Sequence, residues 1–199
     1  MFVGYWNKSV AFTYLSVLSA VAGMGFVAAH KYVLALLALI ICGIVDSFDG
    51  AIARRFDRDE KACNYGVEID SLADSIAFLA LPAFFLITIS NHQPVTVAVA
   101  ALYVLLGVVR LAWFNVTVEE SKGVFHGVPV TQIAATLPFF YVLVKLIEPH
   151  ALVPVLTIVL LIVALLFVTD IRIPKPRGIA LLVILFLFVL TAAGLIIVR

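Results

Sequence analysis

Charged residues are scarce in this sequence. Only 13% of its 199 residues are Asp, Glu, Lys or Arg, whereas 64% are hydrophobic. A soluble domain of this size could not cover so much apolar surface, so a soluble fold is excluded and the chain is expected to lie in a lipid bilayer. The formal net charge is only +1, and no basic cluster is present. This excludes a nucleic-acid partner, because phosphate backbones are bound by many neighbouring Lys and Arg residues.

Cysteine is also rare. Cys42 lies in an apolar run and Cys63 in a polar one, and neither belongs to a CxxC motif or lies beside a histidine cluster. Both are therefore predicted to be free thiols, and neither zinc nor a redox pair is indicated. The N-terminal segment lacks the cleavage pattern of a signal peptide, so we expect its first apolar run to remain as a membrane span.

Long apolar runs dominate the rest of the chain. A helix needs about 20 residues to cross the hydrocarbon core. The runs predict an all-α integral membrane protein, a bundle of six to seven transmembrane helices with a cytoplasm-facing polar cavity, forming one domain over residues 1–199. The sixth run is short and bounded by prolines, so a bundle of six spans is the alternative. The expected spans are 9–29, 32–54, 67–90, 95–116, 128–147, 151–169 and 178–198.

Basic residues are distributed unequally between the two ends of these spans. In the arrangement with seven spans, one end holds ten Lys and Arg residues and the other holds three, Lys31, Lys145 and Arg199. Lys and Arg accumulate on the cytoplasmic side of membrane proteins. The N-terminus and the more basic end of the bundle are therefore predicted to be cytoplasmic.

Four aspartates lie at this end of two apolar runs. Asp46 and Asp49 are three residues apart and Asp70 and Asp74 are four apart, so each pair shares a helix face. The polar loop between the runs folds one helix back on the other, which brings the four carboxylates together. They would repel one another in a poorly solvated site, and a divalent cation would remove this repulsion. Oxygen ligands without His or Cys favour Mg²⁺ or Mn²⁺, with Ca²⁺ as a competitor.

The neighbouring residues suggest a phosphorylated ligand. Gly50 and Ala53 leave the aspartate face of the helix without bulk, although small residues also serve helix packing in membranes. Arg54 offers a fork of donors for phosphate oxygens. The other acids nearby are interpreted as solvated or helix-capping residues: Asp57, Asp59 and Glu60. Glu68 is expected to face the headgroups, with support of the aspartate site as its alternative role.

This pattern resembles the signature of the CDP-alcohol phosphotransferases, integral membrane enzymes of phospholipid synthesis. All eight signature positions are present, as Asp46-x2-Asp49-Gly50-x2-Ala53-Arg54 and Gly66-x3-Asp70-x3-Asp74. The eleven residues between Arg54 and Gly66 exceed the roughly eight that are usual, an insertion that a loop tolerates cheaply.

The resemblance implies a role for each of these residues. The four aspartates would hold one or two ions, Mg²⁺ or Mn²⁺, on the diphosphate of a CDP-linked lipid. Asp74 would also take the proton of the attacking alcohol. The residues implied in binding the CDP-lipid are Gly50, Ala53, Arg54 and Gly66, with Thr13 near the nucleotide.

Later segments resemble the phosphatidylserine synthases of that family. The similar stretches are residues 66–83, 110–116, 125–131 and 171–176. They imply transfer of a phosphatidyl group from CDP-diacylglycerol to L-serine. Serine carries a carboxylate, so its site needs a fixed cation near the metals. The candidate is Arg110, which lies about two turns from the cytoplasmic end of its span. Its alternative role is an ion pair with an aspartate or Glu68. Further candidates for acceptor binding are Asn115, Lys122 and Lys175.

Other readings stay open at this point. The acceptor could instead be glycerol 3-phosphate, inositol or inositol phosphate, although Trp113 replaces an arginine of the similar segment. The lipid donor could carry ether-linked chains. A divalent-cation transporter would also use intramembrane acids, but these should lie at mid-membrane in two repeated halves. The resemblance is compatible with a homodimer. No helix face of regularly spaced small residues indicates whether such a dimer forms.

Overall fold

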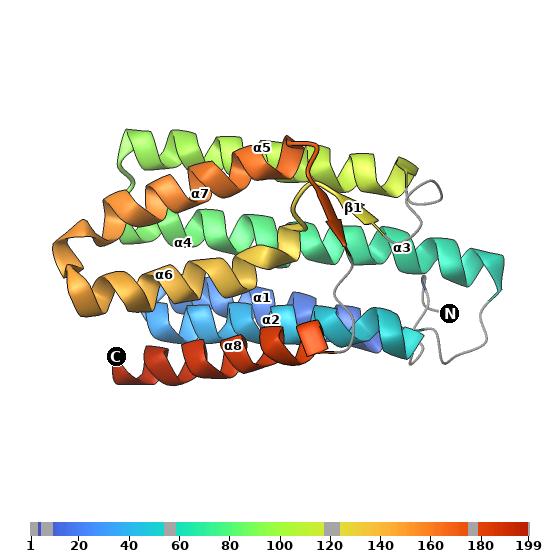
Figure 1. Cartoon of the computed structure of the whole chain (residues 1–199), viewed down its shortest axis with the longest axis horizontal. Coiled ribbons are helices and arrows are strands. Elements are labelled where there is room, and N and C mark those ends of the chain that lie inside the picture. Colours follow the sequence, from blue (N-terminus) through green and yellow to red (C-terminus); the bar gives the residue numbers. More distant parts are fainter. Residues whose placement is uncertain (1–3, 5–9, 54–58, 118–123, 175–178, 199) are drawn as a thin grey trace.

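Helices occupy all seven positions predicted from the sequence in this computed structural model (Figure 1). The structure describes residues 4, 10–53, 59–117, 124–174 and 179–198. A π-helical segment, Ser75–Ala80, joins α3 and α4 into one continuous rod. The predicted all-α fold is thus confirmed. The helices are α1 (Ala11–Ala28), α2 (Tyr32–Ala53), α3 (Glu60–Asp74), α4 (Leu81–Ile89), α5 (Pro94–Thr117), α6 (Ile133–Ile147), α7 (Leu152–Val168) and α8 (Ile179–Ile197).

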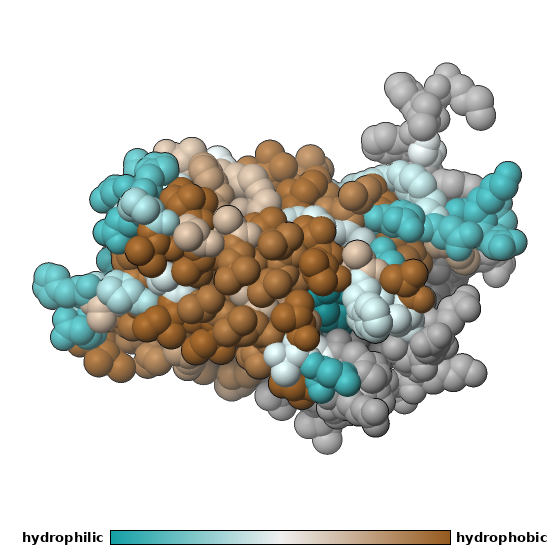
Figure 2. All heavy atoms as spheres, turned by 90° about the horizontal axis from the view of Figure 1, so that it is seen from above, coloured by the Kyte–Doolittle hydropathy of each residue, from teal (hydrophilic) through white to brown (hydrophobic). Residues whose placement is uncertain are grey.

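The helices have the character of an integral membrane protein. Within the described residues, five helical segments are long and apolar enough to cross a bilayer, and Tyr32–Phe48 and Leu185–Ile197 are shorter apolar helices. Figure 2 shows a broad hydrophobic surface over the middle of the molecule, with hydrophilic residues gathered towards the ends. Leu18, Leu105 and Ile162 are among the exposed apolar side chains. Such exposure is expected where lipid replaces water as the solvent.

The third helix begins earlier than the predicted span over 67–90. α3 starts at Glu60, because the carboxylate of Asp59 accepts a hydrogen bond from the Ala62 amide at 2.7 Å and caps the helix. Glu60 adds a negative charge beside the positive helix end. Hydropathy marks only the apolar part of a helix, so the first turns of α3 were missed. Asp59 is a helix-capping residue, as predicted.

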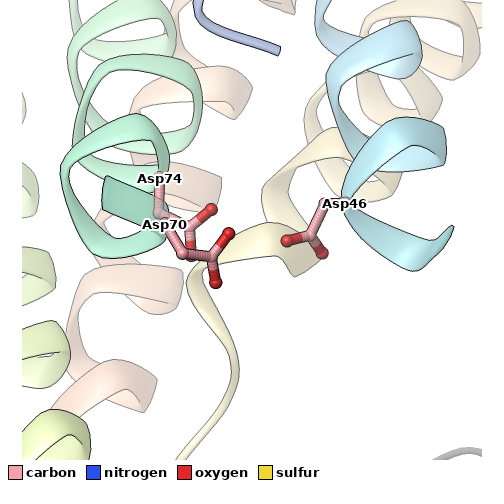
Figure 3. A group of neighbouring side chains, drawn as sticks. All are labelled: Asp46, Asp70 and Asp74. Atoms are coloured by element: carbon pink, nitrogen blue, oxygen red, sulfur yellow. The ribbon is translucent and has the colours of Figure 1, made fainter. Parts of the chain in front are cut away.

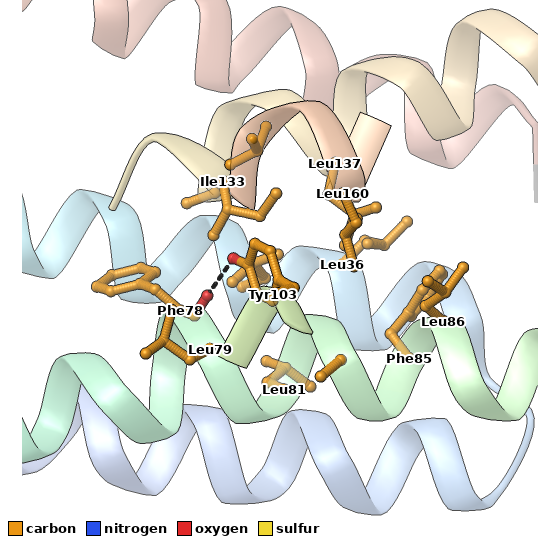
Figure 4. Close-up of a cluster of buried hydrophobic side chains, with 14 of the residues drawn as sticks. Leu36, Phe78, Leu79, Leu81, Phe85, Leu86, Tyr103, Ile133, Leu137 and Leu160 are labelled. Carbon is orange, nitrogen blue, oxygen red and sulfur yellow. Dashed lines mark hydrogen bonds between the residues drawn. The ribbon is translucent and has the colours of Figure 1, made fainter. Parts of the chain in front are cut away.

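One hydrogen bond anchors the α3–α4 rod inside the bundle. Pro82 has no amide hydrogen to donate to the Phe78 carbonyl four residues earlier. The hydroxyl of Tyr103, a fully buried residue of α5, donates to that carbonyl at 2.5 Å (Figure 4). Apolar side chains such as Leu79 and Ile133 surround this bond. A backbone carbonyl deep in the apolar core is thereby satisfied.

Two short strands were not predicted. β1 (Val124–His126) pairs in antiparallel register with β2 (Arg172–Pro174), with Phe125 opposite Ile173. β1 follows the described end of α5 in the chain, and β2 follows α7. Three residues are too few to show an alternating pattern, and the partners lie far apart in the sequence, so local features could not reveal the pair.

Candidate active site

Three of the four predicted aspartates meet between α2 and α3. Asp46 projects from α2, and Asp70 and Asp74 project towards it from α3 (Figure 3). Each residue offers one carboxylate oxygen, and these oxygens all lie within 4.8 Å of one another. All three side chains are partly buried. The spacing of four residues places Asp70 and Asp74 on one face of α3, as predicted.

A glycine lets α6 pack closely against α2 beside Asp46. Gly43 lies about one turn before Asp46, and a Cβ atom at its position would lie 2.6 Å from the Cβ of Ala134. Real Cβ atoms do not approach each other so closely, so glycine is required for this contact. Asp46 is therefore presented from a helix that is held directly against its neighbour.

The aspartates share one cavity with a buried arginine. The cavity has a volume of about 190 Å³, and Arg110 lines it together with Asp46, Asp70 and Asp74. Arg110 is only 6% exposed, and its guanidinium carbon lies 5.3 Å from the centroid of the Phe114 ring. Its Nε atom is buried and has no hydrogen-bond partner. This nitrogen therefore does not make the ion pair that was the alternative role of Arg110.

An unpartnered buried donor has a chemical consequence. Leaving a buried polar group without a hydrogen bond costs about 1–3 kcal/mol, and more for a charged group. Arg110 also lines the cavity, so a carboxylate or phosphate that entered it would meet a positive charge with donors for its oxygens. The arginine is thus suited to binding an anion beside the aspartates.

The wall opposite the aspartates was missed by the sequence reasoning. It consists of Leu111 and Phe114 of α5 and of Pro129, Val130 and Thr131, which precede α6. The resemblance of residues 125–131 to the family is a signal for this wall. The resemblance alone, however, does not show that this segment lies beside the aspartates, which only the folded structure reveals.

Several predicted residues are only partly covered by the structure. Asp49, Gly50 and Ala53 lie at the end of α2, where the backbone alone is described. Arg54, Lys122 and Lys175 lie outside the described residues. Their roles stay predictions.

The structure describes three further predicted residues. Gly66 lies about one turn before Asp70 on α3. Thr13 is buried on α1 and is not among the described residues that line the cavity. The side-chain oxygen of Asn115 accepts a hydrogen bond from the Ser71 hydroxyl at 2.9 Å and so links α5 to α3. This bond gives Asn115 a structural role, and its part in acceptor binding stays a prediction.

The donor set fits a divalent cation. Asp46, Asp70 and Asp74 offer only oxygen ligands, which suit hard ions such as Mg²⁺ and Mn²⁺. Three partly buried carboxylates at this separation repel one another, and a cation bound among them would offset that repulsion.

Comparison with known proteins gives the class of this protein. The model of the CDP-alcohol phosphatidyltransferase family matches residues 6–197. The chain belongs to this family. It is thus an enzyme of the phosphatidyltransferase class, which removes the transporter alternative. Enzymes of this family use divalent cations, in agreement with the aspartate cluster.

Curated relatives of this phosphatidyltransferase carry names that include serine. It is 31% identical over 196 residues to the CDP-diacylglycerol–serine O-phosphatidyltransferase of Helicobacter pylori, covering 94% of this chain and 80% of the relative. It is 30% identical over 145 residues to the archaetidylserine synthase of Methanothermobacter thermautotrophicus, covering 72% and 59%. The protein of Methanocaldococcus jannaschii named CDP-diacylglycerol–serine O-phosphatidyltransferase is 28% identical over 162 residues, covering 81% and 72%. No solved structure matches the chain.

Proposed function

We propose that this phosphatidyltransferase moves the phosphatidyl group of CDP-diacylglycerol to the hydroxyl of L-serine and releases CMP. The observation that carries the proposal is the presence of Arg110 and three aspartates in one cavity of about 190 Å³. The names of the relatives support serine as the acceptor. The archaeal relative leaves an ether-linked lipid as the alternative donor.

Arg110 binds the carboxylate of serine. A guanidinium that lines the cavity can offer two parallel donors to a carboxylate. This contact holds the serine hydroxyl in the cavity that also contains Asp74. Inositol has no carboxylate to make this contact. A phosphorylated acceptor carries more negative charge, and Arg110 is the one basic side chain among the described residues of the cavity.

Asp74 takes the proton of the serine hydroxyl. The hydroxyl oxygen attacks the phosphorus that bears the diacylglycerol, and a new P–O bond forms. The P–O bond to CMP breaks, and CMP leaves with its electron pair. A positioned base of this kind contributes about 10²–10⁴ in rate. This direct attack of the hydroxyl on phosphorus needs no covalent enzyme intermediate.

Asp46, Asp70 and Asp74 would hold a divalent ion, Mg²⁺ or Mn²⁺, with Asp49 as a further ligand. When bound, such an ion neutralises the diphosphate of the donor. The remaining motif residues are assigned to the CDP portion through the family resemblance: Gly50, Ala53, Arg54, Gly66 and Thr13.

An acyl chain of the donor lies in an apolar groove between α1 and α3. The groove has a volume of about 610 Å³ and is lined by Leu18 and Leu72 among others. Ile69 and Ala73, which also line it, directly precede Asp70 and Asp74 in the sequence. The groove therefore lies at the same level along α3 as the aspartates, where the phosphates of the donor would bind.

The aspartate end of the bundle and the N-terminus face the cytoplasm in this proposal. The unequal distribution of Lys and Arg supports this orientation. Serine, a soluble metabolite, would then reach the cavity from the cytoplasm.

The test is CMP release by the purified protein with CDP-diacylglycerol and Mg²⁺ or Mn²⁺. We expect release that depends on both L-serine and the metal. Glycerol 3-phosphate, inositol and inositol phosphate are the comparison acceptors. Release with one of these and not with serine would overturn the choice of acceptor, and release with none of them would overturn the proposed activity.

A further inference from the structure

We propose that Gly127 is a positioning residue that holds Arg110 in the cavity of the aspartates. The inference rests on the proposed function, because it explains how the acceptor-binding cation is kept in place. Gly127 lies outside the family's aspartate motif and is separated from Arg110 in the sequence. Its role follows from the contacts of its backbone.

Gly127 has a conformation and a position that exclude a side chain. Its φ angle is +78°, in the left-handed region that favours glycine. A Cβ atom at this position would lie 2.8 Å from the carbonyl oxygen of Phe167, 3.3 Å from Nε of Arg110 and 3.4 Å from the carbonyl oxygen of Thr169. The first of these contacts is with backbone, which does not give way easily. Any side chain at 127 must therefore displace either its own segment or the guanidinium.

Hydrogen bonds fix the segment of Gly127 against the end of α7. The Gly127 amide donates to the Ile171 carbonyl at 2.8 Å, and the Val128 amide donates to the Leu166 carbonyl at 3.3 Å. The β1–β2 pair continues the same contact. We call these two segments, residues 124–128 and 166–174, the brace. The brace joins two stretches that are separated in the sequence by α6 and most of α7.

The end of α7 also favours a cation at this place. Phe167 belongs to the last turn of α7, whose carbonyl groups lack partners within the helix. These carbonyls give the helix end a partial negative charge, which stabilises a nearby guanidinium. The brace thus places Arg110 beside a favourable dipole, with its buried Nε close to the backbone of Gly127.

Arg110 needs such a restraint because it has space on two sides. It lines the cavity of the aspartates, and it also lines a second cavity of about 520 Å³ with Trp113, Val168 and Asp170. The second cavity does not include the aspartates. Without the close contact of Gly127, the guanidinium can turn into this larger space and leave the acceptor site without its cation.

The experiment substitutes Gly127 and measures the KM for serine and the KM for CDP-diacylglycerol separately. Gly127→Ala should raise the KM for serine by about tenfold to a hundredfold, the effect of moving a binding group by roughly 1 Å. The KM for CDP-diacylglycerol and the metal requirement should stay as in the wild type. Gly127→Asn is the second variant, because Asn tolerates a positive φ angle while still adding a Cβ atom. It should show the same selective rise with less loss of folded protein.

A double-mutant cycle separates positioning from general damage. If Gly127 acts through Arg110, adding Gly127→Ala to Arg110→Ala should change kcat/KM for serine by less than about twofold. Gly194→Ala is the control for a crowded glycine, since its Cβ atom would lie 2.9 Å from Cγ1 of Val142, between α8 and α6. Gly25→Ala, with nothing within 4 Å of the new Cβ atom, controls for the substitution itself.

The outcomes distinguish this inference from the proposed function. Wild-type protein without serine-dependent CMP release contradicts the proposed function, and the cycle is then run with the acceptor that is active. Independent effects of the Gly127 and Arg110 substitutions, or an equal rise in the KM of both substrates, would overturn the positioning role. A selective rise in the acceptor KM that disappears in the Arg110→Ala background supports it.

Discussion

Neighbouring acids of this protein differ sharply in what they do. Asp46, Asp70 and Asp74 lie within reach of one cation, whereas Asp59 caps α3 and Glu68 is exposed. Asp70 and Asp74 share one face of α3 because they are one turn apart, and in the folded protein this face points towards α2. The position of each acid on its helix, more than its presence near the motif, therefore decides its role.

The first prediction concerns Asp74. Asp74→Asn keeps the shape of the side chain but removes the base, so CMP release should fall by at least about 100-fold. Binding of CDP-diacylglycerol should remain largely intact, as measured with a radiolabelled donor. Glu68→Gln, an exposed acid on the same helix, is the matched control and should keep its activity. Normal turnover in Asp74→Asn would rule out its role as the base.

At the scale of the helices, the π-helical segment links the site to the core. Asp74 is the last residue of α3, and the segment Ser75–Ala80 follows at once. π-Helical turns are frequent at functional sites, because they shift the side chains that flank them. The Tyr103 hydroxyl holds this segment through the Phe78 carbonyl. This hydrogen bond thus connects the segment that follows Asp74 to the core of the bundle.

The second prediction tests this bond. Tyr103→Phe leaves the Phe78 carbonyl buried without its partner, which should destabilise the protein by about 1–3 kcal/mol. Thermal unfolding in detergent measures the change. Tyr141→Phe is the control, since Tyr141 is also buried but contributes ring contacts with Phe85. Equal unfolding temperatures for wild type and Tyr103→Phe would show that the bond adds nothing to stability.

At the scale of the whole molecule, a bound cation should couple the site to folding. An ion that binds only the folded protein stabilises it by about 2.7 kcal/mol at 100 times its Kd. Mg²⁺ or Mn²⁺ should therefore raise the unfolding temperature of the wild type, and a chelator should reverse the rise and stop CMP release.

Asp70→Asn removes one of the three carboxylates of the cluster and should lose most of this stabilisation. Asp59→Asn, which changes the helix cap, should keep it. The same shift in the wild type and in Asp70→Asn would mean that the cation binds elsewhere.

The orientation in the membrane is a prediction that the two native cysteines can test. Cys63 lies near the start of α3 and is partly buried, whereas Cys42 is fully buried. A membrane-impermeant maleimide should label the protein in inverted vesicles and not in intact cells, if the aspartate end faces the cytoplasm. Cys63→Ser should abolish the labelling. Labelling of Cys63 in intact cells would reverse the predicted orientation.

The sequence by itself determined the class of enzyme, the helical membrane bundle and the aspartates of the site. Continuous apolar runs of about 20 residues indicate helices, because a helix satisfies all its backbone groups within one segment in lipid. The spacing of Asp70 and Asp74 fixes their shared face, because an α-helix repeats about every 3.6 residues. These are local rules, so they hold without knowledge of the fold.

The tertiary structure decided which distant residues meet. Arg110, Gly127 and the end of α7 come from segments that share no local pattern, and only packing brings them into contact. The same holds for the bond between Tyr103 and Phe78 and for the β1–β2 pair. Hydropathy and spacing describe one helix at a time. Contacts between helices depend on the shapes of both partners, so only the folded bundle defines the wall of the site that faces the aspartates.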